Sequence, residues 1–122
     1  MVSDENDMNP RTIILVKDLM LKSKIKGMAG GDSAVYLSSI EKLFLEIESQ
    51  EVSYLIFDLT LLGPRIEEVI KACKLKLGTT TKIVCFGSHV DKDSFVVAKL
   101  AGADMVVPRS KFFSPTNRSI FM

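Results

Sequence analysis

The amino-acid sequence predicts an α/β fold built around a doubly wound, five-stranded parallel sheet. Short apolar segments alternate along the chain with segments in which apolar residues recur every three or four positions, as strands alternate with amphipathic helices. The segment YLIFDLTLLG (54–63) begins with consecutive apolar residues, which indicates a strand buried on both faces of a sheet. A chain of 122 residues is long enough for one domain with a hydrophobic core. We therefore expect residues 1–10 to be a disordered tail and residues 11–122 to form a single domain.

Five apolar segments have the length and composition of buried strands. They are Thr12–Val16, Ala34–Leu37, Tyr54–Leu59, Ile83–Phe86 and Met105–Val107. Because helix-like segments separate them, right-handed crossovers would make all five strands parallel. The flavodoxin-like strand order 2-1-3-4-5 is the economical arrangement for five such units.

Four predicted helices connect these strands, and their boundaries carry recognisable signals. The residues expected to begin them are Asp18, Ser38 with Glu41 as a capping box, Pro64 and Asp91. The glycines expected to end helices are Gly30-Gly31, Gly78 and Gly102. After Arg109 the chain contains Pro115 and lacks a long apolar period, so a fifth helix should be short or absent.

Composition and charge exclude several classes of protein. The formal net charge is +1 with acidic and basic residues mixed, so we expect neither nucleic acid nor a membrane surface as a partner. No apolar segment is long enough to cross a bilayer, and the polar start is not a secretory signal. Cys73 and Cys85 lie on separate predicted elements without metal-ligand spacing, which is typical of buried thiols in a reducing cytoplasm. We therefore expect a cytoplasmic protein.

The predicted topology gathers polar side chains at one edge of the sheet. In open α/β sheets, ligands bind beyond the carboxyl ends of the strands. The residues expected there are Lys17, Asp18, Asp58, Gly87, Ser88 and Arg109.

Three segments make the chain resemble the receiver domain of bacterial two-component response regulators, the CheY-like proteins. They are ILVKDL (14–19), YLIFDLTLLG (54–63), and KIVCFGSHVD (82–91) followed by AKLAGADMVVPRS (98–110). The resemblance covers residues 11–113, nearly the whole chain. It implies that Asp58 corresponds to the phospho-accepting aspartate and Asp18 to the second of two acids that help to hold Mg²⁺.

The sequence departs from the receiver pattern at the other site positions. Lys17 replaces the first acid, and Gly87 occupies the position of a Thr or Ser hydroxyl, with Ser88 one residue later. Arg109 replaces a Lys, and a planar guanidinium does not place one compact charge as an ammonium does. The pocket would then be near neutral, with two acids and two cations. A cation about 4 Å from Asp58 would contribute roughly 1–4 kcal/mol of attraction and oppose metal binding.

Several interpretations of these residues stay open. Asp58 is either a structural acid paired with Lys17 or Arg109, or a phospho-acceptor. Asp18 is either the N-cap of the first helix or a metal ligand. Ser88 either precedes the cap at Asp91 or supplies the missing hydroxyl. Magnesium, if it binds, would use Asp18, Asp58 and the carbonyl groups of Leu59 and Thr60.

We interpret the chain as a stand-alone, degenerate receiver (a pseudo-receiver) that acts through protein contacts. It would be neither an enzyme nor efficiently phosphorylated, and it would need no cofactor. The alternative is a genuine phospho-accepting regulator that uses Asp58 and Mg²⁺. A flavodoxin-like protein that binds a small molecule or a flavin is disfavoured, because no phosphate-binding loop of Ser, Thr or Gly residues follows the first strand. The face formed by the fourth helix, the fifth strand and the C-terminal segment is the expected site of partner binding or homodimerisation.

Overall fold

A five-stranded parallel sheet in the order β2-β1-β3-β4-β5 forms the centre of the protein. The computed structural model describes residues 11–28, 33–49 and 51–114. The strands are β1 (Thr12–Leu15), β2 (Val35–Leu37), β3 (Tyr54–Asp58), β4 (Lys82–Gly87) and β5 (Met105–Pro108). All four neighbouring pairs are parallel. The predicted fold class and strand order are therefore confirmed.

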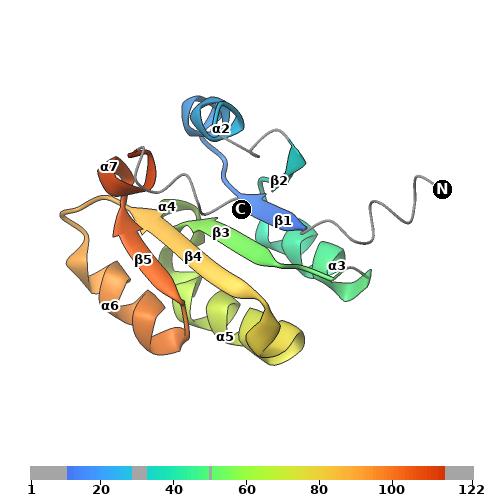
Figure 1. The fold of residues 1–122 in the computed structure, drawn as a ribbon. Helices are drawn as coiled ribbons and strands as arrows, with labels where there is room; N and C mark the ends of the chain where they lie inside the picture. The colour runs from blue at the N-terminus through green and yellow to red at the C-terminus, as the bar shows by residue number, and fades with distance from the viewer. Residues whose placement is uncertain (1–10, 29–32, 50, 115–122) are drawn as a thin grey trace.

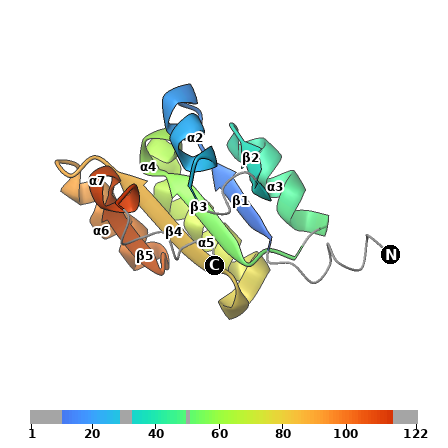
Figure 2. The same ribbon diagram turned by 45° about the horizontal axis from the view of Figure 1, so that its top comes forward.

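Helices lie on both faces of this sheet, as Figure 1 shows. One face carries α3 (Ile40–Ser49), α4 (Leu59–Leu62), α5 (Ile66–Leu77) and α6 (Lys92–Ala101). The other face carries α2 (Leu19–Lys26) near β1 and α7 (Arg109–Phe112) near β5. Figure 2 shows that these two helices lie apart from each other. Two 3-10 helices, η2 (Gly63–Arg65) and η3 (Gly78–Thr80), flank α5. No helix in the described ranges is both long and apolar enough to cross a membrane.

The core is divided by the sheet into two layers. Leu55 and Phe57 of β3 point into the layer under α3, α5 and α6, whereas Ile56 points into the layer under α2 and α7. All three side chains are fully buried. Helices cover both faces of this central parallel strand, which explains why consecutive residues of β3 are apolar.

Most of the predicted helix boundaries agree with the structure. The carboxylate of Asp18 caps α2, and that of Asp91 caps α6. Gly78 and Gly102 follow α5 and α6 with φ angles of 76° and 121°, which favour a residue without a side chain. Gly30-Gly31 lies outside the described residues, and α2 ends earlier than predicted, with Gly27 as its C-cap.

Other boundary predictions were wrong. Pro64 lies in η2, and α5 begins only at Ile66. The side chain that caps α3 is that of Ser39, whose Oγ accepts from the Lys42 N–H at 3.2 Å, because Ser38 directly follows the end of β2. The third strand ends at Asp58 rather than Leu59. Leu59 begins α4, a four-residue helix whose N-cap is Asp58. A helix of four residues is too short to show a helical period in the sequence.

The C-terminal part of the domain is held by aromatic packing. The helix that follows β5, α7, has only four residues, in agreement with the prediction of a short or absent helix at this position. Its Phe112 is fully buried and stacks on Phe86 of β4, with ring centroids 4.6 Å apart. Phe113 packs edge-on against both rings. Pro115, Ile120 and Phe121 lie outside the described residues.

Candidate functional site

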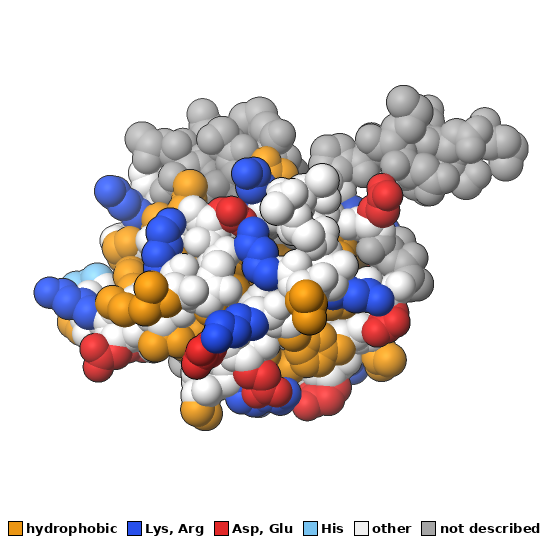
Figure 3. Space-filling model, turned by 90° about the horizontal axis from the view of Figure 1, so that it is seen from below, with side chains coloured by type: hydrophobic (Ala, Val, Ile, Leu, Met, Phe, Trp, Pro, Cys, Tyr) orange, Lys and Arg blue, Asp and Glu red, His pale blue; other side chains and the backbone are white. Residues whose placement is uncertain are grey.

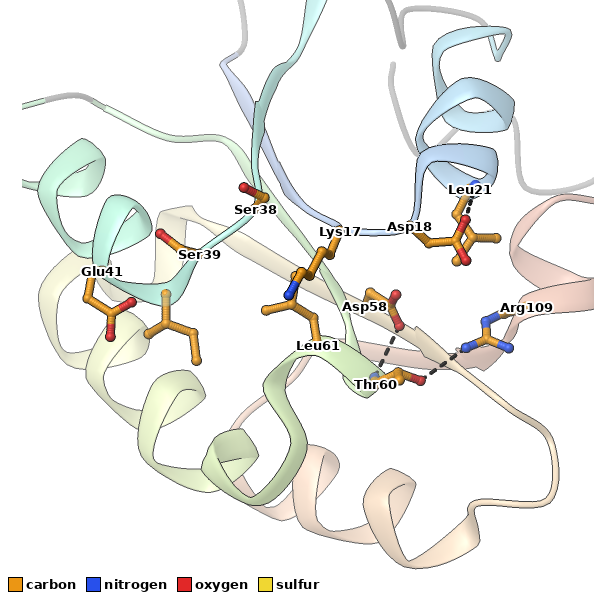
Figure 4. Close-up of a pocket in the computed structure, with 11 residues that line it drawn as sticks. Lys17, Asp18, Leu21, Ser38, Ser39, Glu41, Asp58, Thr60, Leu61 and Arg109 are labelled. Atoms are coloured by element: carbon orange, nitrogen blue, oxygen red, sulfur yellow. Dashed lines mark hydrogen bonds between the residues drawn. The ribbon is translucent and has the colours of Figure 1, made fainter.

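A cavity of about 550 Å³ lies at the carboxyl edge of the sheet (Figure 4). Lys17 and Asp18 reach it from the end of β1, Asp58 from the end of β3, and Arg109 from the end of β5. The parallel strands end at the same edge, so these side chains converge as expected. The opposite wall comes from the start of α3 and from α4. Its residues are Ser38, Ser39, Ile40, Glu41, Thr60 and Leu61.

Asp58 is a buried acid with few partners. Its side chain is 4% exposed, and its Oδ1 accepts one hydrogen bond, from the Thr60 N–H at 3.1 Å. Burial raises the pKa of Asp58 above its ordinary value of 3.8. The hydrogen bond from Thr60 and the positive charge of Arg109 lower this pKa in part, whereas the negative charge of Asp18 raises it further. The net direction is upward, so the cavity favours the protonated acid more than water does.

Arg109 is directed at a hydroxyl group and not at Asp58. Its Nη2 donates to Thr60 Oγ1 at 3.0 Å, across 49 positions of sequence. Its Nε is buried and has no hydrogen-bond acceptor within the described part of the chain. The expected salt bridge between Arg109 and Asp58 is absent from the ion pairs of the described residues. The predicted salt bridge does not form because the Thr60 hydroxyl supplies an acceptor for the Arg109 guanidinium.

Lys17 points into the cavity, but it also forms no ion pair with either acid among the described residues. Figure 4 shows its ammonium on the side of the cavity formed by Ser39 and Leu61, and Arg109 on the other side of Asp58. The expected internal pair of Lys17 with Asp58 is therefore not formed. Lys17 therefore lines the cavity as an exposed cation whose charge lies on the side of Ser39 and Leu61.

Asp18 acts as a helix cap in this structure. Its Oδ1 accepts from the N–H groups of Met20 and Leu21, at 2.8 and 3.1 Å. In Figure 4 the carboxylate lies against the first turn of α2. No group of three His, Cys, Asp or Glu side chains suited to a metal ion occurs within the described ranges. The predicted ligand pair of Asp18 and Asp58 therefore remains a prediction, since no third such side chain joins it within the described ranges.

The predicted hydroxyl position on β4 supplies no hydroxyl to the cavity. Gly87 is buried, and a Cβ added there would meet Phe95 Cε1 at 3.3 Å and the Leu59 side chain at 3.4 Å. Ser88 accepts a weak hydrogen bond from the Val90 N–H at 3.4 Å and does not line the cavity. Ser88 is thus part of the turn that precedes α6.

Sequence reasoning missed the hydroxyl that the cavity does contain. Thr60 stands two residues after Asp58, and only its carbonyl group was considered. Its Oγ1 holds Arg109, and its N–H holds Asp58. The walls formed by Ser38, Ser39, Glu41 and Leu61 were missed as well, because they come from elements that the receiver pattern does not single out.

Both cysteines are buried free thiols, as expected. Burial raises the pKa of Cys73 to about 12 and shifts the pKa of Cys85 in the same direction. Neither lines the cavity. These thiols belong to the core and not to a reactive site.

Comparison with solved structures identifies the fold. A response regulator from Thermotoga maritima matches with a TM-score of 0.76 at 14% identity, over 93% of this chain and 95% of that one. The receiver domain of TorR, the response regulator of the TMAO respiratory system, matches with 0.71 at 16% identity, over 82% and 83%. A response regulator from Burkholderia pseudomallei, solved with a phosphorylated aspartic acid, a calcium ion and citrate, matches with 0.70 at 11% identity, over 92% and 70%.

These likenesses show that the chain has the CheY-like receiver fold. No family model matches the sequence, and no curated protein does. The assignment of the fold therefore rests on structural similarity at sequence identities of 14%, 16% and 11%.

Proposed function

We propose that this protein is a receiver-like signalling module that acts through protein contacts and is not efficiently phosphorylated with Mg²⁺. The receiver fold supports the first part, since the solved structures that share it include response regulators. The chemistry of the cavity supports the second part. We expect no catalytic turnover and no bound cofactor.

The single observation that carries this proposal is the position of Lys17. Phosphoryl transfer to a carboxylate needs a divalent cation and fixed donors, because negative charge accumulates on the transferred group. Mg²⁺ in turn requires several oxygen ligands in close to octahedral geometry. Here Lys17 directs an ammonium into the cavity, and Asp18 is turned to the N-terminus of α2. Asp58 is left as a buried acid whose raised pKa disfavours its ionised form.

The alternative function is a genuine phospho-acceptor. It is favoured by Asp58, which ends the central strand, lines the cavity and has the Arg109 and Thr60 side chains nearby. The Burkholderia pseudomallei structure with the same fold holds a phosphorylated aspartic acid and a calcium ion. In this chain the metal would have to use Asp18, Asp58 and carbonyl groups of Leu59 and Thr60.

Treatment with a phosphodonor distinguishes the two functions. The protein is incubated with Mg²⁺ and acetyl phosphate, and its intact mass is measured; beryllofluoride binding is followed in parallel by NMR at the amides of Asp58 and Thr60. We expect no added phosphoryl mass and no saturable shift. A phosphoryl adduct that forms in the wild type and is lost in Asp58→Asn would establish the alternative.

The partner surface is proposed on the face of α6 and β5. Val90, Val96, Val97, Leu100 and Met105 are exposed there, Leu100 to 81%. Figure 3 shows hydrophobic side chains gathered on the helical layer beside the single histidine, which precedes α6. An apolar surface of this kind marks a protein contact, either with a partner or with a second copy of the chain.

Analytical ultracentrifugation tests self-association through this face. Leu100→Lys is compared with Leu75→Lys, since Leu75 is at least as exposed but lies on α5. If homodimers form through α6, the wild type and Leu75→Lys will sediment as dimers at high concentration and Leu100→Lys as a monomer. Monomers for all three proteins would contradict homodimerisation and leave a different protein as the partner of this face.

A further inference from the structure

The cavity beside Asp58 contains two cations that no carboxylate in it neutralises directly. Lys17 and Arg109 both line the cavity, and neither appears in an ion pair of the described residues. Arg109 is anchored by Thr60 through Nη2, whereas its buried Nε lacks an acceptor. A buried donor without an acceptor is unfavourable, so an oxygen atom that reached it would be favoured.

Each carboxylate of the cavity is engaged elsewhere. Asp18 accepts two backbone N–H groups at the start of α2. Glu41 faces Arg65 across the gap between α3 and η2, with Glu41 Oε2 and Arg65 Nη1 3.4 Å apart. Asp58 is buried and accepts a hydrogen bond from the Thr60 N–H. The unpaired charges that face the cavity are thus positive, although it contains more acids than bases.

The size and walls of the cavity suit a small organic molecule. Its volume of about 550 Å³ lies within the range of about 300–1,000 Å³ found for ligand pockets. Leu21 and Leu61 provide apolar contacts, and the hydroxyl groups of Ser38 and Ser39 lie on the side to which Lys17 points. Such a combination of apolar walls with a few polar groups is typical of a site that orients a ligand.

We propose that this cavity binds a small organic oxyanion, through a carboxylate or phosphate group held by Lys17 and Arg109, without a metal and without a covalent bond. Lys17 acts as a mobile point charge, and Arg109 acts as a donor fixed by Thr60. The occupant would regulate the protein from the position where a receiver holds its phosphoryl group. This inference goes beyond the proposed function and does not depend on whether Asp58 is phosphorylated.

NMR titration in buffer freed of metal ions with a chelating resin tests the proposal with two probes, inorganic phosphate and succinate. We expect saturable shifts at Lys17, Thr60 and the Arg109 side chain, with millimolar or tighter affinity for at least one probe. The tighter probe indicates whether the natural ligand carries a phosphate or a carboxylate group. Lys17→Met should weaken binding at least tenfold, whereas Lys92→Met, which removes an exposed charge from α6, should leave it unchanged.

Asp58→Asn separates this site from phosphorylation. Non-covalent binding should persist in Asp58→Asn, because the anion contacts Lys17 and Arg109. No saturable shift with either probe would overturn the proposal. Equal affinities of Lys17→Met and Lys92→Met would also overturn it, since binding would then reflect net charge alone. Phosphorylation is scored separately by mass with Mg²⁺ and a phosphodonor, so failure of one proposal is distinguishable from failure of the other.

Discussion

Arg109 donates a hydrogen bond from Nη2 to Thr60 Oγ1 at 3.0 Å, which holds the cation at the end of β5 beside Asp58 and not on it. Thr60 also donates its N–H to Asp58. One residue of α4 therefore fixes the positions of both the acid and the cation. Charge, burial and the hydroxyl of Thr60 together determine what the cavity can bind.

Thr60→Val should release Arg109 from this position. The free energy of unfolding should fall by about 0.5–1.5 kcal/mol, because the hydrogen bond from Arg109 Nη2 to Thr60 Oγ1 is lost. Arg109 Nη2 would then lack an acceptor, as its Nε already does. Chemical denaturation measures the change, with Thr79→Val in the exposed η3 helix as the control. Equal stabilities of the two variants would show that the hydrogen bond is not maintained in solution.

Asp58→Asn should stabilise the protein at neutral pH. The folded state raises the pKa of Asp58, so it binds the proton more tightly than the unfolded chain does. The contribution of Asp58 to stability is thus present below its ordinary pKa of 3.8 and is lost as pH rises through the raised value. Asparagine keeps the helix cap without the charge.

Denaturation of the wild type and Asp58→Asn, from near the ordinary carboxyl pKa of about 4 up to neutral pH of about 7, measures this effect. The advantage of the variant should grow with pH and disappear at the acidic end. Asp18→Asn, at an exposed cap, is the control and should give no such gain. A destabilised Asp58→Asn at pH 7 would indicate that the carboxylate has a cationic partner after all.

Lys17→Asp should create a magnesium site. The substitution replaces a cation by an acid beside Asp18 and Asp58 and changes the charge of the cavity by two units. Added carboxylate oxygens are the ligands that Mg²⁺ prefers. We expect the affinity for Mg²⁺, measured by calorimetry, to rise at least tenfold over the wild type. Lys42→Asp on the exposed face of α3 changes the net charge equally and should leave Mg²⁺ affinity unaltered.

Phe112→Ala should destabilise the domain by about 3–5 kcal/mol, the usual cost of removing a buried aromatic ring. Phe112 is fully buried against Phe86 and is the main anchor of the short helix α7. Phe113→Ala, at a half-buried position in the same cluster, should cost less. Thermal or urea denaturation gives both values. Comparable losses for the two variants would mean that α7 is not anchored by Phe112.

The fold was predictable because its signals are local. The apolar run of β3, the cap at Asp91 and the stops at Gly78 and Gly102 each reflect short-range conformational preferences. Their order along the chain then determined a parallel sheet with the observed topology. Ser39 replaced Ser38 as the cap because two adjacent serines are equivalent until the end of β2 is known.

The charged residues of the cavity were predictable, but their pairing and the hydroxyl-bearing walls were not. Strand topology alone brings Lys17, Asp58 and Arg109 to one edge. The choice of Arg109 between Asp58 and Thr60 depends on side-chain geometry over 49 positions, and α4 is too short to show a period. Opposite charges at a shared edge are therefore weak evidence for a salt bridge.

Titration of the wild-type protein with MgCl₂, followed at the amide signals of Lys17, Asp58 and Thr60, tests the central claim most directly. Because Lys17 places its charge in the cavity and Asp18 caps α2, we predict no saturable shift at these amides at millimolar Mg²⁺. Saturable shifts in the low millimolar range that vanish in Asp58→Asn would contradict it, since the cavity would then hold the cation that phosphorylation requires.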